Sequence, residues 1–198
     1  MSKFLIAEWE EQSAIIIAWP NKNTDWKENL REIEQTYIEI VQKITDHQLV
    51  IILSNEKSIK KKFSEEILKN IKIIIVDYND TWTRDYIGLS IKTKQNFHLI
   101  DFKFNGWGGK YNFKKDNSIN LQLFKQNIFS KVEFKYNNFV LEGGSIDSNG
   151  KGTILTTSKC LLNKNRNPNL SKKEIEKTLR ESLGIKKTLW LNNGSISG

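Results

Sequence analysis

Two acidic residues have neighbours that suit chemistry on a cation, and the first is Asp85. It ends the polar segment 79–85, and Trp82 lies three residues before it. A carboxylate accepts paired hydrogen bonds from a guanidinium, and an aromatic ring adds cation–π attraction, so this spacing favours a planar cation. The alternative is structural: Asp85 forms a buried ion pair with Arg84 while Asp80 caps a turn.

The second acid is Glu142, which follows Leu141 and precedes Gly143 and Gly144. Paired glycines let two backbone segments approach closely or adopt positive φ. A plain turn between strands is the structural alternative. Asp85 and Glu142 open similar stretches of sequence 57 residues apart, so we expect them to converge on one pocket, where two carboxylates favour a cationic ligand.

The elements that must position these acids follow an α/β pattern. Three apolar runs rich in β-branched residues predict strands at 14–19, 49–53 and 71–76, separated by helices at 25–46 and 58–69. From there the order becomes strand, strand, helix, strand, and it occurs twice. The predicted elements of the two repeats are 87–92, 97–102, 119–126 and 132–136, then 145–148, 153–157, 171–183 and 187–191.

The second repeat carries the clearest local signals. Asn149-Gly150 predicts a hairpin turn. Ser171 and Glu174 form a capping box at the start of a helix that Gly184 ends. The 57-residue period predicts a third unit opening near position 199, so we expect one truncated domain over 1–198, with unit boundaries near 79–85 and 137–142.

Composition excludes several classes of protein. The longest wholly apolar run, 14–19, is too short to span a membrane, and no secretory signal is evident, so the cytosol is the default compartment. One cysteine and two histidines argue against a metal site, and we expect no cofactor. Of 31 basic residues only four are arginine, so the net charge of +8 reflects surface lysine more than nucleic-acid binding.

The remaining motifs have structural interpretations. Cys160 lies among apolar and hydroxyl residues without a histidine nearby, which favours a buried inert thiol, and neither His47 nor His98 has an evident catalytic partner. The glycine-rich segment 105–110 lacks the spacing of a phosphate loop, so it is a substrate-facing loop or a tight turn. Segment 163–168 is a polar turn with a structural role.

Five motifs together resemble agmatine deiminases of the bacterial peptidyl-arginine deiminase family. They are Glu8-Trp9-Glu10 with Trp19-Pro20, NDTWTRD at 79–85, FNGWGGKY at 104–111, LEGGS at 141–145 and CLLNKNRNP at 160–168. The resemblance runs from residue 8 to the end of the chain. It implies the pentein fold, an α/β propeller of five ββαβ-type units around a pseudo-fivefold axis, of which about three are present here.

The resemblance also implies hydrolysis of agmatine to N-carbamoylputrescine and ammonia through a cysteine amidino-thioether. Asp85 matches a guanidinium-binding aspartate, Trp82 the adjoining pocket wall, and Glu142 the acid that orients the catalytic histidine. We therefore expect Asp85 and Glu142 to be catalytic and all three residues to bind substrate. The expected partner is the cationic substrate, without nucleic acid or membrane, and self-association is compatible with an opened ring.

Two family features have no match in these 198 residues. The Gly-His-x-Asp segment is expected just after Gly198 and the nucleophilic cysteine farther on, and Cys160 matches a non-catalytic position. The chain alone is therefore expected to be inactive. The alternatives are a peptidyl-arginine or arginine deiminase of the same family, a non-catalytic binding fragment, and a basic nucleic-acid binder.

Overall fold

The computed structural model describes residues 3–94, 96–129 and 132–193, and these form two compact units. One unit is Glu11–Thr83, and the other combines Met1–Glu10 with Arg84–Gly198. In the described ranges no helix has the length and apolar character needed to cross a membrane.

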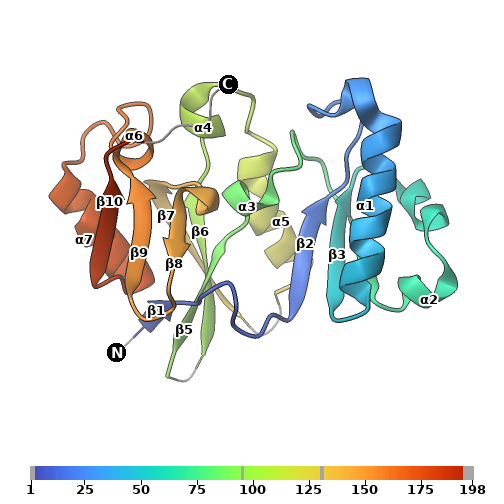
Figure 1. Ribbon diagram of the computed structural model, residues 1–198, viewed down its shortest axis with the longest axis horizontal. Helices are drawn as coiled ribbons and strands as arrows, with labels where there is room; N and C mark the ends of the chain where they lie inside the picture. Colours follow the sequence, from blue (N-terminus) through green and yellow to red (C-terminus); the bar gives the residue numbers. More distant parts are fainter. Residues whose placement is uncertain (1–2, 95, 130–131, 194–198) are drawn as a thin grey trace. The chain divides into compact units, whose positions relative to one another are not determined.

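The unit Glu11–Thr83 is built on a parallel three-stranded sheet in the order β2-β3-β4 (Figure 1). The strands are β2 (Ala14–Ala18), β3 (Leu49–Ser54) and β4 (Ile71–Ile75). Helix α1 (Leu30–Thr45) connects β2 to β3 and packs on β3. Its buried side chains meet apolar residues of the sheet in one core, which also contains Trp19. The strands are as predicted within two residues.

Both helices predicted in this unit are shorter than expected. Residues Lys27–Asn29 form a 3₁₀ turn before α1 begins at Leu30. The predicted helix at 58–69 is wrong as a single element, because a 3₁₀ segment (Lys57–Lys62) and α2 (Glu65–Leu68) replace it. Phe63 between them is extended and buried in the core, so packing of its ring interrupts the helical periodicity.

The larger unit contains both predicted strand-strand-helix-strand repeats. In the first, β5 (Leu89–Thr93) pairs antiparallel with β6 (Phe97–Lys103), and α5 (Ile119–Lys125) leads to β7 (Glu133–Val140), which runs parallel to β6. Strand β1 (Lys3–Leu5) adds antiparallel to β5. Strand β7 is longer than predicted, and a register shift between Phe102 and Lys103 lets it continue to Val140.

The second repeat has the same order. Strand β8 (Ile146–Ser148) pairs antiparallel with β9 (Thr153–Thr157), and β10 (Lys187–Leu191) is parallel to β9. Helix α7 (Lys172–Leu183) has the predicted capping box and ends at Gly184, whose φ is 72°. Short segments of this unit include α4 (Gly106–Gly109), whose backbone is left-handed, α6 (Ser158–Leu161) and the 3₁₀ segments Asp116–Ser118 and Gly143–Ser145.

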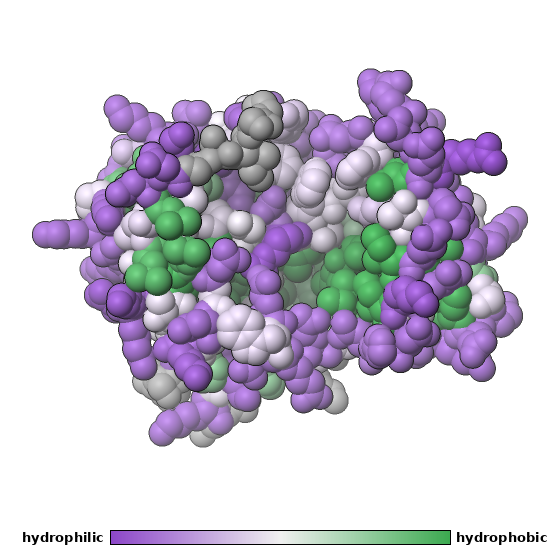
Figure 2. All heavy atoms as spheres, viewed as in Figure 1, coloured by the Kyte–Doolittle hydropathy of each residue, from purple (hydrophilic) through white to green (hydrophobic). Residues whose placement is uncertain are grey.

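The core of this unit joins the two repeats. Apolar residues of β5, β6, β9 and α7 share one buried cluster. On the face shown in Figure 2, hydrophobic side chains also gather over β9 and β10. Leu189 and Leu191 of β10 are 43% and 48% exposed, and β10 is the terminal strand of its described sheet. Strand edges of this kind are sites for further pairing.

A buried polar cluster fixes the backbone that follows Asp85. The side chain of Asn120 accepts a hydrogen bond from the Gly88 N–H and donates to the Tyr86 carbonyl and to Asp101 Oδ1, both at 2.7 Å. Asp101 is 4% exposed, and burial raises its pKa to about 6 although the hydrogen bond from Asn120 acts in the opposite direction.

This raised pKa predicts a pH-dependent stability. Between the unfolded pKa of 3.8 and the folded pKa of about 6, the folded protein keeps a proton on Asp101 that the unfolded chain has released. The unfolding free energy therefore falls as the pH rises through this range. At about 1.4 kcal/mol per pKa unit, Asp101→Asn should gain about 2 to 3 kcal/mol of unfolding free energy relative to wild type between pH 4 and pH 7. Urea unfolding of the complete protein measures this difference. Asp147→Asn on the exposed side of β8 is the control, and an equal pH trend for both variants would contradict the assignment.

Candidate functional site

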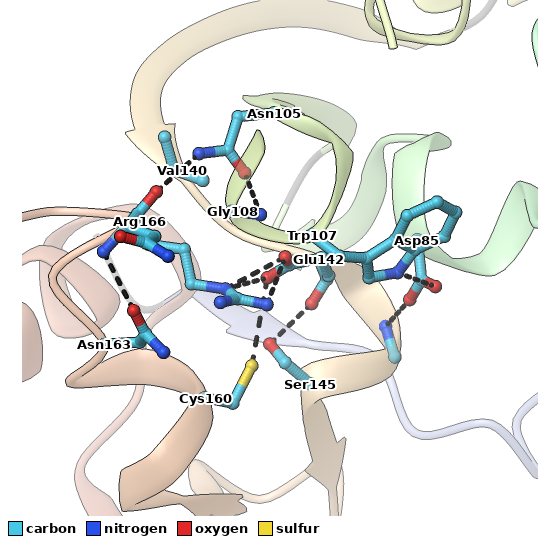
Figure 3. Close-up of polar contacts among 12 residues, drawn as sticks. Asp85, Asn105, Trp107, Gly108, Val140, Glu142, Ser145, Cys160, Asn163 and Arg166 are labelled. Atoms are coloured by element: carbon cyan, nitrogen blue, oxygen red, sulfur yellow. Dashed lines mark hydrogen bonds and ion pairs between the residues drawn. The ribbon is translucent and has the colours of Figure 1, made fainter. Parts of the chain in front are cut away.

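The structure places Asp85 and Glu142 in the same unit, on segments that touch each other. Asp85 belongs to the single-turn helix α3 (Thr83–Tyr86), and Glu142 stands between β7 and the Gly143–Ser145 turn. The Gly144 N–H donates to Asp85 Oδ1 at 2.9 Å (Figure 3). This contact therefore joins Asp85 to the segment that directly follows Glu142.

Asp85 is held by neutral donors. Its other carboxylate oxygen, Oδ2, accepts a hydrogen bond from the indole Nε1 of Trp107 at 3.0 Å. The alternative of an Arg84–Asp85 pair is wrong, because Arg84 instead forms an ion pair with Glu8 at 2.6 Å and donates to the Ile146 carbonyl. Backbone and indole N–H groups orient the Asp85 carboxylate without cancelling its charge.

The paired glycines after Glu142 are required by close approach. A Cβ at Gly143 would overlap the backbone carbonyl of Arg84, and a Cβ at Gly144 would overlap the carboxylate of Asp85. Neither position has a positive φ among the described glycines, so space and not backbone conformation selects glycine here. The sequence Glu-Gly-Gly therefore lets β7 end directly against α3.

The segment 105–110 is a tight turn of unusual handedness. Residues Gly106, Trp107, Gly108 and Gly109 all have positive φ, and that of Trp107 is 56°. Asn105 caps the turn, since its side chain accepts from the Gly108 N–H at 2.9 Å. A left-handed conformation costs a residue with a Cβ about 1 to 2 kcal/mol, and such strain commonly occurs at functional sites. Here it presents the Trp107 indole to Asp85.

Glu142 is more buried than Asp85 and has a charged partner. Only 2% of the residue is exposed, and Arg166 donates from Nε to Oε1 and Oε2 at 3.0 and 3.2 Å while its Nη2 lies 3.0 Å from Oε1. Figure 3 shows the guanidinium directed at the carboxylate. Sequence reasoning missed Arg166 by assigning 163–168 a structural role. No pattern in the sequence marks Arg166, because the burial of Glu142, which makes a cation necessary, is a property of the folded chain.

Cys160 lies beside the same carboxylate. Its Sγ is 3.9 Å from Glu142 Oε2, and burial together with the negative charge of Glu142 raises the pKa of the thiol. A raised pKa lowers the thiolate fraction at neutral pH. This environment agrees with the interpretation of Cys160 as an inert thiol, although its position next to Glu142 was not predicted.

Trp82 belongs to the other unit, Glu11–Thr83. The residue is 46% exposed, and its ring lies 6.2 Å from that of Trp26. The Trp26 indole donates to Thr81 Oγ1 at 2.8 Å. In the same segment burial raises the pKa of Asp80, with nearby Asp25 adding to the effect. Trp82 thus has a partly exposed ring in a segment that also carries Asp80.

Neither histidine has a contact with Asp85 or Glu142 among the contacts of the described residues. His98 is on β6, and its Nδ1 lies 2.8 Å from Glu133 Oε2 on β7, while His47 follows α1 in the other unit. Within residues 3–94, 96–129 and 132–193, His, Cys, Asp and Glu side chains form no group of three that could hold a metal ion. Catalytic roles for His47 and His98 therefore have no geometric support.

The glycine contacts predict different outcomes at neighbouring positions. Gly143→Ala should lower the unfolding free energy by about 2 kcal/mol or more, because the clash is with backbone. In Gly144→Ala the added methyl group would contact the Asp85 side chain, which can rotate away. The unfolding free energy should therefore fall by only about 1 kcal/mol, the contribution of one hydrogen bond. Urea unfolding of the complete protein compares the two. A larger loss for Gly144→Ala would contradict the packing described.

Comparison with known proteins places the chain in a family. The family model for the Porphyromonas-type peptidyl-arginine deiminase matches residues 4–198. An agmatine deiminase of Pseudomonas aeruginosa is 30% identical over 194 residues, covering 95% of this chain and 52% of that protein. The chain therefore spans about half the length of the curated relatives it matches.

Solved structures extend the comparison to the fold. A C. jejuni agmatine deiminase determined with substrate bound has a TM-score of 0.91 and 40% identity over 98% of this chain and 57% of its own. An Enterococcus faecalis agmatine deiminase gives a TM-score of 0.86 with 27% identity, covering 98% and 54%. These matches confirm the α/β pentein fold for the part that the chain covers. The chain belongs to the Porphyromonas-type peptidyl-arginine deiminase family.

Proposed function

We propose that the complete protein containing this chain hydrolyses agmatine to N-carbamoylputrescine and ammonia. The observation that carries the proposal is the Asp85 carboxylate, whose charge is oriented by Gly144 and Trp107 but not neutralised by them. Such a group can accept paired hydrogen bonds from a guanidinium. The relatives named agmatine deiminase support this choice of substrate.

The proposed reaction has two steps. A thiolate attacks the guanidinium carbon, so that a C–S bond forms, a C–N bond breaks, and a histidine protonates the departing ammonia. Water then attacks the amidino-thioether, forming a C–O bond as the C–S bond breaks, and releases N-carbamoylputrescine. The thiolate and histidine are proposed to come from sequence outside these 198 residues, so the chain alone is proposed to be inactive.

Within this chain, Asp85 is proposed to hold the guanidinium and Glu142 to orient the catalytic histidine. Trp82 is proposed as the aromatic wall on the strength of the family resemblance and its exposed ring. The reaction requires no cofactor, and we propose that it takes place in the cytosol.

Removing the charge of Asp85 should weaken binding of agmatine without unfolding the protein. Asp85→Asn keeps the shape, loses the charge, and replaces one of the two accepting oxygens with an NH2 group that cannot accept from Gly144 or Trp107. KM for agmatine should rise about 100-fold, because the charge-assisted interaction with the guanidinium is lost. Steady-state assay of ureido product and ammonia in the complete protein measures this, with Asp147→Asn on β8 as control. Unchanged kinetics in Asp85→Asn would remove Asp85 from the site.

The second candidate keeps the chemistry and changes the substrate to free or peptidyl arginine, as the family description suggests. The arginine carboxyl group needs a basic partner, whereas the cations described at Asp85 and Glu142 are already in ion pairs: Arg84 with Glu8 and Arg166 with Glu142. Agmatine should therefore be preferred over arginine by at least about tenfold in kcat/KM. Competition between the two substrates measures the ratio, and preference for arginine would support the alternative.

A further inference from the structure

We infer that Arg166 is a positioning residue, which holds Glu142 in the orientation the proposed reaction uses. The inference rests on the proposed function. Its starting point is the geometry of the pair, in which the planar guanidinium meets both carboxylate oxygens within 3.2 Å. Side-chain exposure is 11% for Arg166 and 3% for Glu142, so water does not compete for the contact. Lysine cannot reproduce this fork, because its ammonium is a single point charge.

The loop that carries Arg166 is fixed at both sides. Asn167 accepts from the Val140 N–H and donates to the Val140 carbonyl, at 3.0 and 2.9 Å, which binds the loop to the end of β7. Asn105 donates to the Asn165 carbonyl at 2.8 Å, which binds the loop to the left-handed turn. Arg166 is therefore flanked on both sides by side chain-to-backbone hydrogen bonds that do not involve Glu142.

The left-handed turn links the supports of the two acids. A Cβ at Gly108 would lie 2.9 Å from the Asn165 side chain and 3.0 Å from Arg166 Nη1, so the turn packs directly on Arg166. The residue before Gly108 is Trp107, which donates to Asp85. One turn thus supports both the neutral donor to Asp85 and the cation paired with Glu142.

The two acids differ in the net charge that each one, together with its hydrogen-bond partners, presents to a substrate. Arg166 balances the charge of Glu142, whereas the contacts described for Asp85 are with neutral N–H groups. Asp85 therefore supplies the net charge that attracts a guanidinium. Glu142 supplies a carboxylate fixed in direction, and Arg166 keeps it from turning toward the incoming cation.

A double-mutant cycle in the complete protein tests this role. Arg166→Gln should lower kcat for agmatine about 100-fold with a smaller change in KM, because Glu142 is misplaced while Asp85 still binds substrate. Arg166→Lys keeps the charge and should recover about tenfold of that loss. In the Glu142→Gln background, Arg166→Gln should cost less than about threefold, because the group it positions is already altered.

Lys164→Gln is the matched control, since it removes one positive charge from an exposed position of the same loop. It should leave kcat and KM unchanged. Thermal unfolding of each variant identifies a general loss of structure, and Arg166→Lys then carries the comparison if Arg166→Gln does not fold. Independent, multiplying effects of the Arg166 and Glu142 substitutions on kcat would overturn the inference while leaving the proposed function intact. A wild-type protein without agmatine turnover would overturn the proposed function, and the inference with it.

Discussion

A buried carboxylate destabilises the fold unless a cation or hydrogen-bond donors compensate its charge, and the region around Glu142 supplies that compensation. Transfer of an isolated charge into the interior costs several kcal/mol, and removing one member of a buried pair typically costs about 3 to 5 kcal/mol. Arg166 supplies the compensating charge. To place it there, a polar loop is bound to the end of β7 through Asn167 and to a strained turn through Asn105. The stability of these loops therefore depends on the pair that they enclose.

The contrast between the two acids follows from what surrounds them. Asp85 is partly exposed and receives hydrogen bonds from neutral groups, whereas Glu142 is enclosed and paired with a cation. A carboxylate with neutral donors, such as Asp85, is suited to attract a cation, and a carboxylate paired with a cation, such as Glu142, is suited to hold a neighbouring group in one orientation. Two side chains of similar chemistry can thus serve different purposes because their hydrogen-bond partners differ.

Sequence patterns predicted the strands and both repeats because alternating and β-branched runs report burial directly. They also predicted the capping box at Ser171 and the stop at Gly184, where the chemistry is local. The helix at 58–69 was mispredicted because burial of Phe63 outweighs local helical periodicity. Asp85 and Glu142 could be singled out by their neighbours in sequence. Arg166 could not, since its role depends on a partner 24 residues away that only the folded chain brings within reach.

The left-handed turn at Gly106–Gly109 bears on how sequence variation in this protein should be interpreted. Three of its four residues lack a Cβ, and the fourth, Trp107, accepts the strained conformation to reach Asp85. Replacement of Gly106 or Gly108 would be selected against through backbone handedness and steric overlap, without any contact to substrate. Invariance of these glycines among relatives would therefore record the geometry of a scaffold. In a mutational scan they would resemble active-site residues, and only Trp107 would owe its identity to a side-chain contact with Asp85.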